Sequence, residues 1–202
     1  MVFLPWQKSN FWQNEKLREA VGFSLEIIKI VIISLAIIFP VRYFLIQPFY
    51  VKGASMEPNF YNHEYLIINE ISYRFEAPVR GEIVVFRPPN GPAGDFFIKR
   101  IIGLPGDRVV VQDGKIKIFN ETHPTGVVLD ETQYLERRLV TAGNSDVTLG
   151  ANEYFVCGDN RPSSLDSRTF GPIKASSIVG KVWLRGWPFD RVTIFGVPAY
   201  NL

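Results

Sequence analysis

Three observations predict a mainly β protein in which a single transmembrane helix precedes an antiparallel β-sheet domain. The apolar stretch at residues 21–45 is long enough to cross a bilayer, which takes ~20 largely apolar residues. Short runs of apolar and β-branched residues, separated by turn residues, follow it. Beyond residue 50 no helical period extends over three turns. We therefore expect a polar segment at 1–20, a helix at 21–45 and a β domain at 46–202.

Composition excludes several classes of protein. With 202 residues, 47% of them hydrophobic, the chain can bury a core in one domain of moderate size. Its 22 basic and 20 acidic residues are interspersed, so no stripe for nucleic acid is present. Cys157 is the only cysteine, which rules out an internal disulfide and a cysteine zinc site. His63 and His123 lack partners at metal-ligand spacing, so we expect no metal and no cofactor.

The apolar stretch allows three interpretations. A cleaved signal peptide is disfavoured because ~20 residues precede the stretch and no small-x-small site follows it. A buried core helix is a second interpretation, but helices apolar on nearly all sides are typical of membranes. A single membrane anchor fits best. Lys8, Lys16 and Arg18 precede it, against Arg42 and Lys52 after it, which favours a cytoplasmic N-terminus and a β domain across the membrane.

Eight runs after the anchor have the composition of strands. They are Tyr65–Asn69, Glu82–Phe86, Phe96–Ile102, Arg108–Gln112, Lys115–Phe119, Glu153–Cys157, Ile178–Leu184 and Arg191–Phe195. Asp113-Gly114 between two alternating runs predicts a tight hairpin. The polar stretch Asn120–Gly150 has few apolar positions, so we expect residues 112–150 to form a small accessory β-hairpin or loop outside the core.

One lysine lies inside an apolar strand. Alternation along Phe96–Ile102 puts Lys99 and Arg100 on opposite faces. A strand lysine usually extends its amine to water. Alternatively, apolar neighbours exclude water and lower the pKa of Lys99, which would allow it to act as a general base. In that case Lys99 points into a cleft and Arg100 away from it.

Ser55 is a possible partner for this lysine. It follows Gly53-Ala54, whose small side chains let a substrate backbone come close. A serine beside Gly and Pro is more often a turn residue or a cap. Because neither histidine stands in a triad context, a Ser-Lys dyad is the available chemistry for acyl transfer. The sequence leaves open whether the fold brings Ser55 and Lys99 together.

Four segments occur in the same order as the conserved motifs of type I signal peptidases, and the chain resembles that family. The segments are Gly53–Pro58, Arg80–Phe86, Lys99–Asp107 and Gly158–Arg168. The preceding anchor fits as well. The resemblance covers residues 47–171 and implies a β catalytic domain of the signal peptidase type. It also implies a serine endopeptidase that removes signal peptides from exported preproteins after small residues (Ala-x-Ala).

The resemblance implies a role for each matching residue. Ser55 would be the nucleophile that forms an acyl-enzyme, with its N–H in the oxyanion hole, and Lys99 the general base, oriented by Ser164. The residues that would support the site wall are Asp159, Asn160, Asp166 and Arg168. The residues that would bind substrate are Val51, Gly53, Met56, Phe60, Phe97 and Ile98. Apolar members of this set have the alternative of being ordinary core residues. Ile98, on the side of Arg100, would need a twist or bulge to reach the pocket.

Several positions depart from the family pattern, among them Asn59-Phe60, His63-Glu64, Glu82 and Cys157. Gly53 stands where many members carry a hydroxyl as a second oxyanion donor, and Lys52 replaces a common proline. The implied partners are signal peptides of preproteins, the lipid bilayer and a nearby secretion translocon, with no nucleic acid. The implied location is the inner or plasma membrane, or a thylakoid-type membrane, with one span and the catalytic domain on the extracytoplasmic side.

Two other functions share some of these features. A self-cleaving repressor-type protease would use the same Ser-Lys chemistry, but the anchor argues against it, as does the lack of a DNA-binding segment before the β domain. A membrane-tethered binding domain with a vestigial dyad is an alternative of a different class. Cleavage of a preprotein whose signal ends in Ala-x-Ala distinguishes it from an enzyme.

Overall fold

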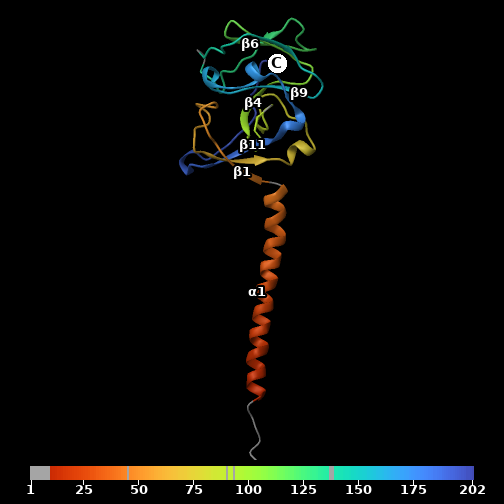
Figure 1. Ribbon diagram of the computed structural model, residues 1–202, viewed down its shortest axis with the longest axis vertical. Coiled ribbons are helices and arrows are strands. Elements are labelled where there is room, and N and C mark those ends of the chain that lie inside the picture. Colours follow the sequence, from red (N-terminus) through yellow and green to blue (C-terminus); the bar gives the residue numbers. More distant parts are fainter. Residues whose placement is uncertain (1–9, 45, 90, 93, 137–138) are drawn as a thin grey trace, which may run out of the picture. The chain divides into compact units, whose positions relative to one another are not determined.

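The computed structural model describes residues 10–44, 46–89, 91–92, 94–136 and 139–202, which divide between two units that meet at residue 44. The first unit is one helix, α1 (Asn10–Phe44) (Figure 1). Its stretch Glu15–Pro40 is long and apolar enough to cross a membrane. The helix begins at Asn10 rather than at residue 21, because Glu, Lys, Leu, Arg and Ala at positions 15–20 are strong helix formers.

The second unit is mainly β, and all its described strand pairs are antiparallel, as predicted. The larger sheet has the order β1-β2-β11-β3-β4-β9-β10, with β12 paired to β11. Its strands are β1 (Ile46–Tyr50), β2 (Tyr65–Asn69), β3 (Ile83–Phe86), β4 (Phe97–Gly103), β9 (Glu153–Cys157), β10 (Ile173–Lys174), β11 (Ile178–Trp187) and β12 (Thr193–Ile194). The short helices are α2 (Ser167–Phe170), η1 (Ser72–Arg74), η2 (Arg161–Ser163), η3 (Ala175–Ser177) and η4 (Phe189–Arg191).

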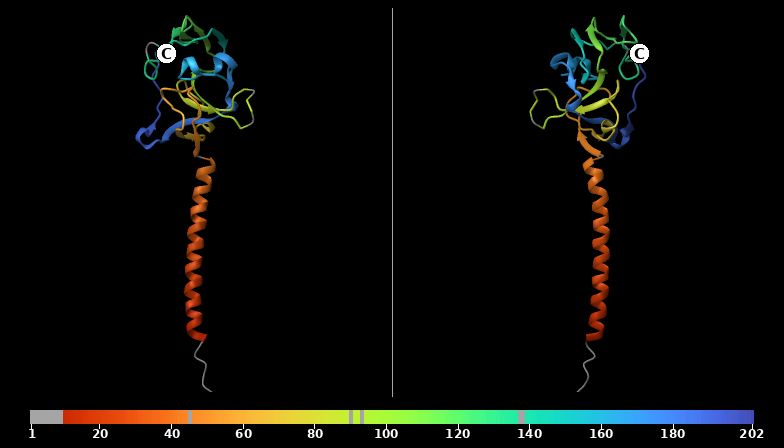
Figure 2. Two further views of the ribbon diagram at one scale, coloured as in Figure 1. Left: turned by 60° about the vertical axis from the view of Figure 1, so that its left-hand side comes forward. Right: turned by 90° about the vertical axis from the view of Figure 1, so that its right-hand side faces the viewer.

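A smaller sheet has the order β7-β6-β5-β8. Its strands are β5 (Arg108–Gln112), β6 (Lys115–Phe119), β7 (Val127–Val128) and β8 (Ser145–Thr148). Both residues of the predicted hairpin turn have positive φ, 51° at Asp113 and 75° at Gly114, which matches the right-handed twist of the strands. Figures 1 and 2 show this sheet (green to teal) beside β9, on the side of the unit opposite β1.

Most of the predicted accessory β region at 112–150, which contains the polar stretch Asn120–Gly150, lies in a separate sheet, but the expectation that it lies outside the core was wrong, because two of its leucines are buried. β8 completes the smaller sheet, and Leu129 and Leu149 are buried in a cluster with Ile102 and Phe155 of the larger sheet. The stretch is polar on average because only one face of β8 packs inward, and alternation hides a core strand when few of its residues are apolar.

Strand β4 separates two apolar clusters and has one partly open edge. Ile98 packs on one cluster, whereas Phe97 and Ile101 pack on the other. β4 pairs with β3 from Phe97 to Arg100, but its pairing with β9 begins only at Arg100. Among the described residues, the other edge of residues 97–99 therefore has no strand partner, and the candidate site lies there.

Candidate active site

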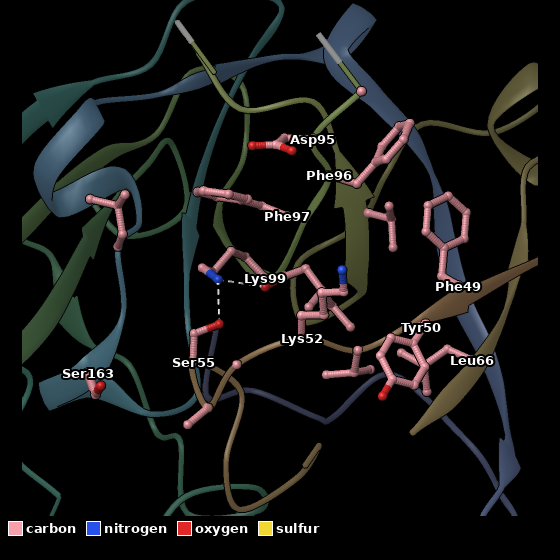
Figure 3. Close-up of a pocket in the computed structure, with 17 residues that line it drawn as sticks. Phe49, Tyr50, Lys52, Ser55, Leu66, Asp95, Phe96, Phe97, Lys99 and Ser163 are labelled. Carbon is pink, nitrogen blue, oxygen red and sulfur yellow. Dashed lines mark hydrogen bonds between the residues drawn. The ribbon is translucent and has the colours of Figure 1, made fainter. Parts of the chain in front are cut away.

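Lys99 and Ser55 are in direct contact. The Nζ atom of Lys99 donates to Ser55 Oγ at 2.7 Å and to the carbonyl oxygen of Ile98 at 2.8 Å (Figure 3). Only 3% of Lys99 is exposed. Burial lowers the pKa of Lys99 to about 8, although the nearby acids Asp166 and Asp159 oppose this shift. A neutral amine hydrogen-bonded to a hydroxyl is the arrangement that general-base activation of serine requires.

The two residues reach each other from different parts of the larger sheet. Lys99 lies on the same face of β4 as Phe97, and its Nζ lies 5.4 Å from the centre of the Phe97 ring. Ser55 lies in the turn that follows β1. The Val51 N–H donates to Glu64 O at 2.9 Å, which holds the start of this segment beside the start of β2.

The loop after β9 fixes the backbone of Ser55. The N–H of Asn160 donates to the Ser55 carbonyl at 3.0 Å, and its side-chain amide donates to Ala54 O at 2.9 Å. A Cβ atom on Gly158 would lie 2.4 Å from Ser55 O and 2.1 Å from Ser164 Oγ. Only glycine therefore permits this approach.

Asp159 forms a buried ion pair with Arg100. Arg100 Nε and Nη2 donate to the two carboxylate oxygens at 2.9 and 2.7 Å, and the Asn59 side chain donates to the same carboxylate at 2.8 Å. The guanidinium of Arg100 lies 3.9 Å from the centre of the Tyr134 ring. Arg100 points away from the cleft that holds Lys99, as predicted. Since each partner is hydrogen-bonded, the pair is tolerated inside the protein.

Asp166 and Arg168 form a second pair behind the loop. Arg168 Nε and Nη2 donate to the Asp166 carboxylate at 2.8 and 2.7 Å, and Gly158 N–H donates to it at 2.9 Å. Burial alone would raise the pKa of Asp166, but these donors outweigh burial and hold that pKa below its usual value. The Asp166–Arg168 pair thus holds the turn at Gly158 in place through the hydrogen bond from the Gly158 N–H.

Ser164 does not form the hydrogen bond to Lys99 that the resemblance implies. Its Oγ is buried and forms no hydrogen bond with the described residues. The Lys99 amine instead directs its hydrogen bonds to Ser55 and to Ile98 O.

A cavity of about 520 Å³ surrounds the Ser55–Lys99 contact (Figure 3). Of the six expected substrate-binding residues, four line this cavity: Val51, Gly53, Phe97 and Ile98. Met56 and Phe60 lie in the core beneath it, 1% and 0% exposed. Met56 is held there because its Sδ accepts from Asp159 N–H at 3.4 Å, and Phe60 packs on Phe195. Lining residues that the sequence did not indicate include Phe49, Tyr50, Lys52, Leu66, Val85 and Phe96.

Ile98 reaches the cavity without a bulge. The register irregularity of β4 lies between Ile101 and Gly103, away from Ile98. Because residues 97–99 have an open edge, side chains from both faces of β4 border the cavity. The expected conflict between alternation and pocket lining is therefore absent.

Gly53 has a conformation that explains the missing hydroxyl. Its φ is +92°, which strains any residue with a side chain, and its N–H donates to Asn62 Oδ1 at 3.2 Å. A serine or threonine at this position would require a different backbone.

Sequence reasoning missed a buried cluster that supports the loop. Arg161 donates to the Gly158 carbonyl at 3.0 Å, to Glu131 at 2.7 Å and to Thr141 Oγ1 at 2.6 Å. Arg161 lies within a segment that matches the family, so the sequence could have indicated its importance. Glu131 and Thr141 lie in the polar stretch, where no sequence pattern distinguishes them from surface residues. Among the described residues, no group of three or more His, Cys, Asp or Glu could hold a metal ion.

Comparison with known proteins places the chain in a family. Residues 24–187 match the family model described as "Signal peptidase, peptidase S26". The chain is 37% identical over 172 residues to a protein of Synechocystis sp. named as a probable signal peptidase I, covering 83% of this chain and 75% of the other. It is 33% identical to signal peptidase IB of Staphylococcus aureus, covering 83% and 91%. A crystal structure of a signal peptidase I from Enterococcus faecalis is 31% identical, with a TM-score of 0.42, and covers 52% of this chain and 97% of the other.

The family match spans most of the chain and includes the segments that hold Ser55, Lys99 and their supporting pairs. The chain therefore belongs to the signal peptidase family, peptidase S26, and is a peptidase that removes signal peptides.

Proposed function

We propose that the chain is a membrane-anchored serine endopeptidase that cuts preproteins after small residues (Ala-x-Ala), with Ser55 as nucleophile and Lys99 as general base. The observation that carries this proposal is the 2.7 Å contact between Lys99 Nζ and Ser55 Oγ beside an open cavity. The burial of Lys99 adds to it, because a lysine whose pKa is about 8 is partly neutral at the pH of most compartments.

In the first half-reaction, neutral Lys99 takes the Ser55 hydroxyl proton as Oγ attacks the scissile carbonyl carbon. The oxyanion of the tetrahedral intermediate accepts from the Ser55 N–H, and preorganised donors of this kind are worth ~3–4 kcal/mol each. Protonated Lys99 then gives its proton to the leaving amine. The products are an acyl-enzyme on Ser55 and the free N-terminus of the mature protein.

In the second half-reaction, Lys99, neutral again, takes a proton from a water that attacks the acyl carbon. The second tetrahedral intermediate collapses, Ser55 Oγ leaves, and Lys99 returns the proton to it. The signal peptide departs with a new carboxylate, and the resting site is restored.

The open edge of β4 would bind the substrate as an added strand. The backbone groups of Ile98 face this edge, and Val51 and Ile98 give the adjacent cavity an apolar floor. Pocket size alone discriminates by only ~1–3 kcal/mol per methylene, so confinement to a membrane adds to selectivity.

The proposed location is a plasma, inner or thylakoid-type membrane, crossed once by α1. The support is the length and composition of Glu15–Pro40. The β unit would then work on the extracytoplasmic side, beside the translocon that delivers its substrates and against the lipid bilayer.

Substitution of the two reacting residues tests the proposal. Ser55→Ala and Lys99→Ala should each reduce cleavage of an Ala-x-Ala preprotein at least ~1000-fold, because neither nucleophile nor base can be replaced by water. Lys99→Arg should fail as well, since arginine does not give up its proton. Near-full activity of Lys99→Ala would remove lysine from the mechanism, and no cleavage by the native chain would favour a binding domain. Circular dichroism of each purified variant serves as the folding control.

A further inference from the structure

The open edge of β4 dictates how an extended substrate would lie. Backbone groups of successive residues point to opposite edges of an antiparallel strand. Ile101 N–H donates to Glu82 O at 2.9 Å, on the β3 side. Ile98 and Arg100 therefore point to the other edge, where Arg100 pairs with Cys157 and Ile98 borders the cavity. A substrate strand that continues the position of β9 would pair with Ile98.

The floor and the mouth of the cavity differ in polarity. Val51 is 5% exposed and packs with Ile98 in the apolar cluster, so these two residues form the floor. Lys52, the next residue, is exposed and projects into the mouth (Figure 3). Side chains of an extended substrate alternate. If the first and third residues before the cut face the floor, the second residue faces the mouth.

Lys52 is available to interact with a substrate side chain. Among the described residues it has no hydrogen-bond or ion-pair partner, and Lys99 is occupied by Ser55. Asp95, the other exposed charge that lines the cavity, precedes Lys99 by four residues, ~13 Å along an extended chain. Asp95 would therefore face substrate residues farther from the cut.

We propose that Lys52 is a specificity-determining residue that favours an acidic side chain, and disfavours a basic one, at the second residue before the cut. This inference rests on the proposed function of the Ser55–Lys99 site. An exposed ion pair changes affinity up to about fivefold. Attraction of one charge and repulsion of the other therefore predict about a five- to tenfold preference for Glu over Lys.

Three synthetic peptides that differ only in the middle residue of Ala-x-Ala, with x as Gln, Glu or Lys, test the proposal. The full chain in neutral detergent is used, so that lipid charge plays no part. We expect kcat/KM to follow Glu > Gln > Lys, and the ratio of Glu to Lys to approach one at 1 M salt, where the screening length is ~3 Å. Lys52→Met should abolish the ratio, and Lys52→Glu should invert it.

Lys115→Met is the matched control, because Lys115 is an exposed lysine on β6 of the smaller sheet. It should retain the native preference. A Lys52→Met enzyme with an unchanged Glu-to-Lys ratio overturns the inference, as does a native ratio of one at low salt. The Gln peptide keeps the two proposals distinct: its cleavage depends on Ser55 and Lys99 whatever the ratio, and failure to cut it counts against the proposed function.

Discussion

Burial sets the pH at which Lys99 can work. In the proposed mechanism the lysine must be neutral to accept the Ser55 proton, and its pKa of about 8 lies below the ordinary lysine value because burial disfavours the charge. Below that pKa, activity should fall about tenfold per pH unit as the base is protonated. We therefore expect kcat/KM on an Ala-Gln-Ala peptide to rise with a midpoint near pH 8, and a profile flat down to pH 5 would contradict a lysine base.

The variant Asp166→Asn tests the dependence of activity on the pKa of Lys99 in a second way. Asp166 raises the pKa of Lys99 through its negative charge, against the effect of burial. Removing that charge lowers the pKa of Lys99, so the midpoint of the profile should move to lower pH even if maximal activity also drops. The position of the midpoint does not depend on the amount of folded enzyme, which separates electrostatics from stability.

Residue types indicated Ser55 and Lys99 as candidates, the family resemblance paired them, and neither indicated the full pocket. Ser55 and Lys99 carry chemical signals, a small-residue turn and a cation in an apolar strand, and these signals do not depend on the tertiary fold. Met56 and Phe60 have the same apolar character as Val51 and Ile98, and only packing decides which of them lines a cavity and which is buried below it. The loss of the expected Ser164–Lys99 bond likewise depends on side-chain directions that a sequence motif does not contain.

At the scale of elements, alternation and turn residues were informative. β2, β5, β6 and β9 have the predicted bounds, because each alternates or packs on both faces between clear turn signals. β1 was missed because Gln47 and Pro48 interrupt it, and a proline argues against a strand except at a sheet edge, which is where β1 lies. β8 was missed because a half-polar strand resembles a loop.

The connection from β7 to β8 supports the loop after β9, which holds the backbone of Ser55. Glu131 binds the fully buried Arg161, which holds the Gly158 carbonyl, and the Asn59 amide donates to Tyr134 O at 2.9 Å. These contacts link the smaller sheet to the turn that fixes Ser55. Glu131 is therefore a positioning residue that does not touch the reacting atoms.

Glu131→Gln should lower kcat about tenfold with little change in KM. Without the Glu131–Arg161 ion pair the loop after β9 can move, and it would then carry the Ser55 N–H away from the developing oxyanion. It should also lower the melting temperature, since breaking a buried ion pair costs ~3–5 kcal/mol when one charge is left without its partner. Kinetics normalised to titrated active sites separate the two effects.

Asp146→Asn is the matched control, because Asp146 pairs with Arg108 in the same small sheet but both side chains are about half exposed. Exposed pairs contribute ~0–1 kcal/mol, so this variant should keep the native kcat and nearly the native melting temperature. A Glu131→Gln enzyme that melts earlier but turns over at the native rate per active site would reduce Glu131 to a stabilising role.

At the scale of the whole molecule, the candidate active site and the candidate membrane span belong to separate units. The three apolar clusters, the cavity and the Ser55–Lys99 contact all involve residues after Leu45. The first unit supplies Glu15–Pro40, whose apolar side chains are exposed throughout. In the proposed function this stretch would contribute by confinement, which would raise the effective concentration of the enzyme near substrates in the same membrane.

Removal of residues 1–44 tests this division. A soluble Ala-Gln-Ala peptide gains nothing from confinement, so we expect its kcat/KM to stay within about threefold of the full chain. A preprotein embedded in vesicles should be cut about 100-fold more slowly by the shortened chain, because tethering two partners typically gains that factor or more. The two substrates are compared at equal enzyme concentration and equal folded fraction. Equal rates of both enzymes on the embedded preprotein would show that recognition lies wholly in the β unit, and loss of peptide cleavage would show that the reactive site depends on α1.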